Sequence, residues 1–155
     1  MDNLNFPSFR FRIKKSEKGK LIFDIVRKKF VLLTPEEWVR QHLLHHLVHQ
    51  LGYSSHLIKV EGQIMVHHTQ KRFDVVAYRP DGRVYLLAEC KAPQVPVDQG
   101  VFDQAARYNL ATQSSYTLLT NGLTHYCCQM DQHAGQYIFI DHFPPPPEKG
   151  RKLHP

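Results

Sequence analysis

Two acidic residues and a lysine interrupt otherwise apolar segments in the middle of the chain. Asp74 lies in RFDVVAY, and Glu89 and Lys91 lie in LLAECKAP. Ionised groups are costly to remove from water, so their presence in apolar segments requires a specific role. Two carboxylates and an ammonium are suited to holding a Mg²⁺ ion and activating a water beside a phosphodiester. These residues are therefore our first candidates for a catalytic site.

An Asp-Gly pair between the two segments predicts a tight hairpin. In the segment 80–83, Asp81-Gly82 is expected to form a two-residue loop, because Gly tolerates the positive φ that such a loop needs. Counting back along both strands from this loop places Asp74 opposite Glu89. Since side chains alternate along a strand, Lys91 is expected on the same face as Glu89. The hairpin thus predicts that the three groups meet.

Carboxylates placed so close together repel each other unless a cation lies between them. Mg²⁺ suits Asp74 and Glu89 because it prefers oxygen ligands and keeps several waters, and Mn²⁺ is expected to substitute for it. The backbone carbonyl of Cys90 is expected to point to the same place and to add a ligand. Lys91 is expected to orient or deprotonate the attacking water. The alternative is a structural salt bridge of Lys91 with either acid.

A helix is predicted to begin at Thr34-Pro35-Glu36-Glu37 and to end at Gly52. Thr34 fits the N-cap, Pro35 the first helical position and Glu37 the third, as in a capping box. Glu36 has no such role, and its spacing from the apolar residues puts it on the core-facing side. It is either a further metal ligand or a favourable charge at the helix N-terminus.

A second helix is predicted over residues 97–112. Gln104 and Tyr108 are four residues apart and therefore share a face of this helix. The pair is suited to bind a phosphate or to hold Lys91 in place, and ordinary packing is the alternative.

Four segments, read in order, resemble a known family: TPEEWVRQ, RFDVVAY, LLAECKAP and FDQAARYN, followed by LLTNGLTHYCC. The pattern resembles the N-terminal nuclease domain of the restriction (HsdR) subunit of type I restriction enzymes and, more broadly, the PD-(D/E)XK nucleases. The resemblance implies that Asp74 and Glu89 are metal ligands and that Lys91 is the catalytic lysine. It also implies Gln104 and Tyr108 as the Q-x-x-x-Y motif and Glu36 as the upstream glutamate. Phe73 stands where the family name has Pro.

The fold that we expect is α/β, a restriction-endonuclease-like mixed central sheet flanked by helices, with the core order α-β-β-β-α-β. Residues 1–33 are predicted to form an N-terminal β-hairpin appendage, 34–143 the nuclease-like domain, and 144–155 a disordered, Pro-rich basic tail. Asp24, within the appendage, has no basic partner at the needed spacing and is given no role.

The basic composition, with a net charge of +6 and a pI of about 9.3, favours a polyanionic partner. The resemblance implies DNA as that partner, restriction-modification subunits as companions, a homodimer by analogy and a bacterial cytoplasmic location. No membrane segment or disulfide framework is expected.

The expected function is Mg-dependent endonuclease cleavage of DNA. The first alternative is a non-catalytic nuclease-like module that binds DNA or protein. The second is a zinc protein that uses the histidines of the first helix, among which His45 and His49 have chelating i, i+4 spacing. Without an HExxH pattern or cysteine partner, a solvated face is the favoured reading of His42, His45 and His49.

Overall fold

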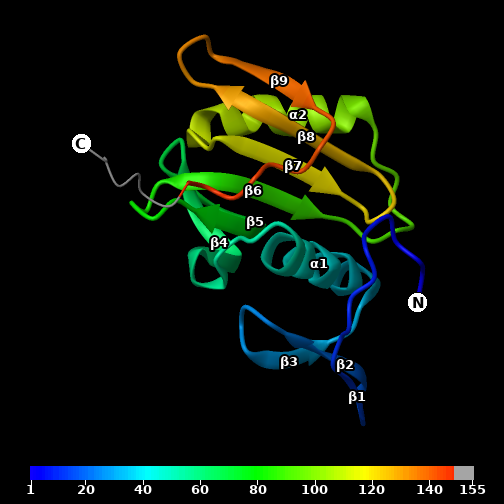
Figure 1. Cartoon of the computed structure of the whole chain (residues 1–155). Helices are drawn as coiled ribbons and strands as arrows, with labels where there is room; N and C mark the ends of the chain where they lie inside the picture. The colour runs from blue at the N-terminus through cyan, green and yellow to red at the C-terminus, as the bar shows by residue number, and fades with distance from the viewer. Residues whose placement is uncertain (149–155) are drawn as a thin grey trace.

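The computed structural model describes residues 1–148 and contains two sheets and two α-helices (Figure 1). The larger sheet has six strands in the order β4-β5-β6-β7-β8-β9. Every neighbouring pair is antiparallel except β6 and β7, which are parallel. The strands are β4 (Ile58–Val66), β5 (Thr69–Tyr78), β6 (Val84–Cys90), β7 (Tyr116–Thr120), β8 (His125–Asp131) and β9 (Gln136–Ile140).

The first helix, α1 (Pro35–His45), begins where the capping pattern predicted. The Thr34 side chain accepts a hydrogen bond from the Glu37 backbone N–H at 3.1 Å, and Pro35 occupies the first turn. The helix continues as a π-helical segment, His46–Gln50. It ends before Gly52, whose φ of +84° is a conformation that glycine adopts without strain.

The two helices lie on opposite faces of the large sheet (Figure 1). Val39 and Leu43 of α1 pack with Val75 and Leu86 in the main core cluster. The second cluster contains Phe102 and Ala106 of α2 (Gln99–Asn109) with residues of β7 and β8. The mixed central sheet flanked by helices and the core order α-β-β-β-α-β are confirmed, and β8 and β9 extend the sheet.

The crossover between β6 and β7 explains their parallel pairing, because parallel neighbours need a long connection. The Asp98 side chain caps α2 by accepting from the Val101 N–H at 2.8 Å, and a 3₁₀ turn, Leu110–Thr112, follows the helix. The predicted helix 97–112 therefore matches α2 and this turn.

The N-terminal region forms a three-stranded antiparallel sheet, which has one strand more than the predicted hairpin. Its strands are β1 (Ile13–Ser16), β2 (Gly19–Asp24) and β3 (Lys29–Leu32), with β2 in the centre. A short turn that uses a positive φ at Lys28 sends the chain back along β2. This third strand leads directly into α1.

Asp24 fixes this sheet to α1 and is fully buried. Its carboxylate accepts hydrogen bonds from the Arg27 Nε at 2.7 Å and the Gln41 Nε2 at 2.9 Å. Arg27 Nη2 also donates to Glu37 Oε1 at 2.9 Å. Burial raises the pKa of Asp24, but the hydrogen bonds from Arg27 and Gln41 outweigh it and leave the pKa below its ordinary value. Asp24 thus has a structural role that the sequence reading did not assign.

The start of the predicted C-terminal tail lies against the large sheet. The Tyr53 hydroxyl donates to the carbonyls of Pro144 at 2.8 Å and Pro145 at 3.1 Å, and the Tyr85 hydroxyl also donates to Pro145. The predicted disorder is therefore wrong for Pro144 and Pro145, because hydrogen bonds from two buried tyrosines hold their carbonyls in place. Residues 149–155 of the predicted tail lie outside the described residues.

Candidate active site

The β5–β6 hairpin has the predicted register in its centre. Val75 pairs with Ala88 and Val76 pairs with Leu87, so Asp74 and Glu89 occupy the next opposed positions. Beyond them, Cys90 is the last residue of β6.

The loop that sets this register differs from the predicted two-residue turn. Arg79 N–H donates to Arg83 O at 2.8 Å and Gly82 N–H donates to Arg79 O at 2.9 Å, which leaves three residues in the loop. Gly82, with φ of +89°, takes the left-handed position that a three-residue loop requires. The longer loop is compensated by a register shift after Ala77, where Tyr85 has no partner on β5. The predicted placement of Asp74 opposite Glu89 is therefore correct, although the predicted two-residue loop is wrong.

Asp74 lies at an interruption of the sheet. Its carboxylate Oδ2 accepts a hydrogen bond from the Cys90 backbone N–H at 2.7 Å. Phe73 and Val76 share one cluster, whereas Val75 packs in the main core, so the alternation of faces breaks at Asp74. The break directs a half-buried carboxylate to the end of β6.

Glu61 of β4 lies at the same interruption. Val60 pairs with Val75 and Gly62 pairs with Phe73, which puts Glu61 opposite Asp74. Glu61 has a φ of +56°, a conformation that costs energy for a residue with a side chain. Backbone strain therefore coincides with the position of the half-buried acid.

The electrostatic surroundings of Asp74 are negative. Burial raises its pKa most, and the nearby carboxylates of Glu36 and Glu89 raise it further. The hydrogen bond from Cys90 and the charge of Arg40 act in the opposite direction without restoring the ordinary pKa. Across residues 1–148, no Lys, Arg or His nitrogen lies within 4.0 Å of this carboxylate. A cation bound beside this carboxylate would favour its ionised form.

Glu89 is held by Lys71 rather than by Lys91. Lys71 Nζ lies 3.3 Å from Glu89 Oε1. The same ammonium is 4.3 Å from the ring centroid of Tyr108 and 4.7 Å from that of Phe73. The structure therefore brings Tyr108 of α2 to the acidic end of β6 through Lys71.

Glu36 lies in the first turn of α1 and contacts Arg40. Arg40 Nη2 is 3.9 Å from Glu36 Oε2, and Arg40 Nε is 3.1 Å from Glu37 Oε2. Arg40 Nη1 is also 3.9 Å from Glu61 Oε1. One buried arginine therefore connects three glutamates beside the candidate site.

Two predicted site residues stand apart from these contacts. The Lys91 backbone N–H donates to Thr120 O at 2.8 Å, and its ammonium forms no ion pair within residues 1–148. Gln104 is exposed on α2. No group of three or more His, Cys, Asp and Glu side chains in the described part of the chain is arranged to hold a metal ion. The acids lie near one another, but basic partners hold all of them except Asp74.

Arg40 and Glu61 were not predicted to belong to this site, and Lys71, a charged residue beside Asp74, was not predicted to pair with Glu89. The signal for Glu61 was available, because an isolated glycine inside a strand pattern, here Gly62, indicates a bulge or a close backbone approach. A Cβ at Gly62 would lie 2.8 Å from the Val76 Cγ2, which explains the need for glycine. No sequence signal separates Lys71 or Arg40 from surface charges.

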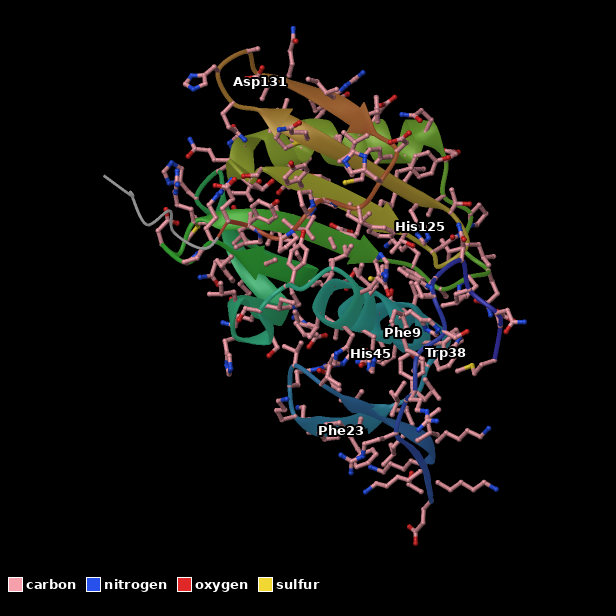
Figure 2. The ribbon with its side chains drawn as sticks, in the orientation of Figure 1. Phe9, Phe23, Trp38, His45, His125 and Asp131 are labelled. Atoms are coloured by element: carbon pink, nitrogen blue, oxygen red, sulfur yellow. The ribbon has the colours of Figure 1, made fainter. Side chains whose placement is uncertain are left out.

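The histidines of α1 are buried, so the predicted solvated face is wrong for His42 and His45. Both are less than a tenth exposed and pack against Phe11, at ring-centroid distances of 4.7 and 4.5 Å. Figure 2 shows Phe9, Trp38 and His45 gathered where the N-terminal segment crosses α1. Burial, followed by the charges of His49 and His42, lowers the pKa of His45 to about 4. The residues that cover these histidines lie outside the helix, so the helical pattern alone does not reveal their burial.

The structure and its acidic centre define a mixed α/β protein with half-buried carboxyl groups in the middle of β5 and near the end of β6. Residues 35–144 match the family described as type I restriction enzyme R protein N terminus, and the chain belongs to this family. No curated protein matches the sequence. Neither α-helix in the described part is long and apolar enough to cross a membrane.

Proposed function

We propose that this protein is a Mg²⁺-dependent endonuclease of the PD-(D/E)XK type that hydrolyses DNA phosphodiester bonds. The observation that carries the proposal is Asp74, a half-buried carboxylate with a raised pKa, one backbone donor and two further acids nearby. Membership of the restriction R-protein family supports DNA as the substrate.

The site offers oxygen donors of the kind that Mg²⁺ prefers, although the described side chains are not already arranged as a metal-binding group. Asp74 and Glu89 would hold Mg²⁺, with Glu36 and the Cys90 carbonyl as further oxygen donors. Bound Mg²⁺ supplies Lewis-acid activation of the phosphodiester and of a water. Lys91 would orient the attacking water, and Gln104 and Tyr108 would position the phosphate.

Lys71 occupies the carboxylate of Glu89 that the metal would need. Its ammonium neutralises Glu89 at 3.3 Å, so a cation that binds Glu89 must replace this contact. With Glu89 bound to a cation instead, the Lys71 ammonium would be available to a phosphate at this end of β6, where a positive charge is useful.

The proposal is tested by nicking of supercoiled plasmid with Mg²⁺ or Mn²⁺. Cleavage by the wild type, and its loss in Lys91→Ala and Asp74→Asn, are expected. Arg83→Ala and Asp81→Asn are matched controls, because both residues are exposed in the loop before β6, at the other end of this strand from Glu89. Cleavage that persists unchanged in Lys91→Ala would defeat the assignment.

Metal binding is tested separately by thermal unfolding. Mg²⁺ is expected to raise the midpoint of the wild type and not that of Asp74→Asn. Without metal, Asp74→Asn is expected to melt higher than the wild type at pH 7, because a raised carboxyl pKa means that ionisation opposes folding. The amide oxygen of Asn can still accept the Cys90 hydrogen bond.

A non-catalytic DNA-binding module is the second candidate. The ion pair between Lys71 and Glu89 favours it, because this contact stabilises the acidic centre without a metal. Such a module would bind DNA equally in EDTA and in Mg²⁺, with no metal-dependent change in melting.

A further inference from the structure

The positive charge of this protein is concentrated at its N-terminus. Residues 1–33 contain nine lysines and arginines and three acidic residues, an excess of six that equals the net charge of the whole chain, +6. Residues 34–155 contain basic and acidic residues in equal number. The three-stranded sheet that residues 13–32 form is therefore the cationic part of the molecule.

The two faces of this sheet differ. Ile22 and Asp24 are fully buried, which identifies the face that is turned inward. Because side chains alternate, Phe23 lies on the outer face, and its partner Phe30 lies beside it. Figure 2 shows Phe23 on this sheet, apart from the large one.

Cations cover the two rings of the outer face. The Arg12 guanidinium carbon lies 4.5 Å from the Phe23 centroid and 5.4 Å from the Phe30 centroid, and Lys14 Nζ lies 4.1 Å from the Phe30 centroid. Neither cation forms an ion pair with any acid in residues 1–148. The rings thus hold both positive groups in position while leaving their donors free for a ligand.

The sheet is fixed next to the candidate active site. The buried contacts of Arg27 with Asp24 and Glu37 join it to the first turn of α1, which also carries Glu36. A polyanion bound to the outer face would therefore be held by a part of the protein that is anchored beside the acidic centre.

We propose that the outer face of the three-stranded sheet binds the phosphate backbone of duplex DNA. Duplex DNA presents closely spaced phosphates, which match a row of unpaired, positioned cations. Because Arg12 and Lys14 cover the phenylalanine rings, the face offers charge rather than a platform for stacking bases, and binding is independent of sequence. This inference rests on the proposed function for its choice of DNA but not on cleavage.

The test is fluorescence anisotropy of a labelled duplex in EDTA, measured over a series of salt concentrations. For Arg12→Gln/Lys14→Gln, the slope of log K against log salt is expected to become shallower by about 1.8, since each phosphate contact contributes about 0.9. Lys59→Gln/Arg83→Gln, which removes the same charge from β4 and from the loop before β6, is expected to keep the wild-type slope. Thermal melting confirms folding, and Lys14→Gln alone, with about half the effect, replaces the double variant if it does not fold.

Equal slopes for the wild type and Arg12→Gln/Lys14→Gln would overturn the inference. So would binding to phosphatidylglycerol vesicles that excess duplex does not displace, because the sheet would then be a lipid-binding surface. The two proposals fail separately. A Lys91→Ala variant that still cleaves overturns the active site alone, and DNA binding that does not need Arg12 and Lys14 overturns the surface alone.

Discussion

Acid is expected to destabilise this protein through His45, which is buried between the N-terminal segment and α1. Its pKa is about 4 in the folded protein and 6.5 for the exposed side chain. Between these two pH values, His45 is therefore protonated in the unfolded chain and neutral in the folded protein. The contribution of neutral His45 to the free energy of unfolding is therefore fully present above pH 6.5 and is lost as the pH falls toward 4.

The size of this effect follows from the two pKa values. One pKa unit corresponds to about 1.4 kcal/mol, so between pH 7 and pH 4.5 His45 is expected to remove about 2 kcal/mol from the free energy of unfolding. Burial lowers the pKa of His42 and His46 as well, so these histidines are expected to add to the loss, whereas protonation of Asp74, whose pKa is raised, acts in the opposite direction.

Urea unfolding at the two pH values, followed by the fluorescence of Trp38, measures the loss directly. Trp38 is the single tryptophan and its ring lies 4.4 Å from that of His42, centroid to centroid. His45→Phe keeps an aromatic ring beside Phe11 and cannot titrate, so its loss is expected to be about 2 kcal/mol smaller than that of the wild type. His133→Gln, an exposed histidine beyond β8, serves as the control. Identical losses in His45→Phe and the wild type would refute the reasoning.

Three further substitutions test the remaining contacts. Asp24→Asn is expected to cost about 3 kcal/mol in urea unfolding, because it breaks a buried ion pair, and a loss below about 1 kcal/mol would contradict its anchoring role. Gly62→Ala is expected to lower the free energy of unfolding by about 1–3 kcal/mol, because its Cβ would overlap the buried Val76. Gly100→Ala in α2 is the control and is expected to raise the free energy of unfolding by up to about 1 kcal/mol. Equal effects of the two substitutions would exclude the steric explanation. Lys71→Gln is expected to lower the Mg²⁺ concentration needed for thermal stabilisation, and a higher requirement would show that Lys71 does not compete for Glu89.

The sequence was sufficient to predict the large sheet and the opposed positions of Asp74 and Glu89, because strand periodicity and an Asp-Gly loop are local signals. The length of that loop was predicted wrongly, and the register shift after Ala77 compensated for the difference. Bulges depend on packing across the whole sheet, so a local pattern does not reveal them.

Contacts between distant segments account for the other differences. Asp24 was given no role because its partners, Arg27 and Gln41, belong to a turn and to a separate helix. The histidines were assigned to solvent because their cover comes from Phe9 and Phe11, outside the helix. The pairing of Glu89 with Lys71 likewise depends on the relative placement of two strands.

The contacts of the first few residues also constrain how the protein folds during synthesis. Asn5 N–H donates to Gly122 O at 2.7 Å, and the Asn5 carbonyl lies 2.7 Å from His125 Nε2. These partners leave the ribosome long after the N-terminus does. The segment around Asn5 must therefore wait, without these partners, until the turn between β7 and β8 has been synthesised, so this part of the native structure cannot form in step with the order of the chain.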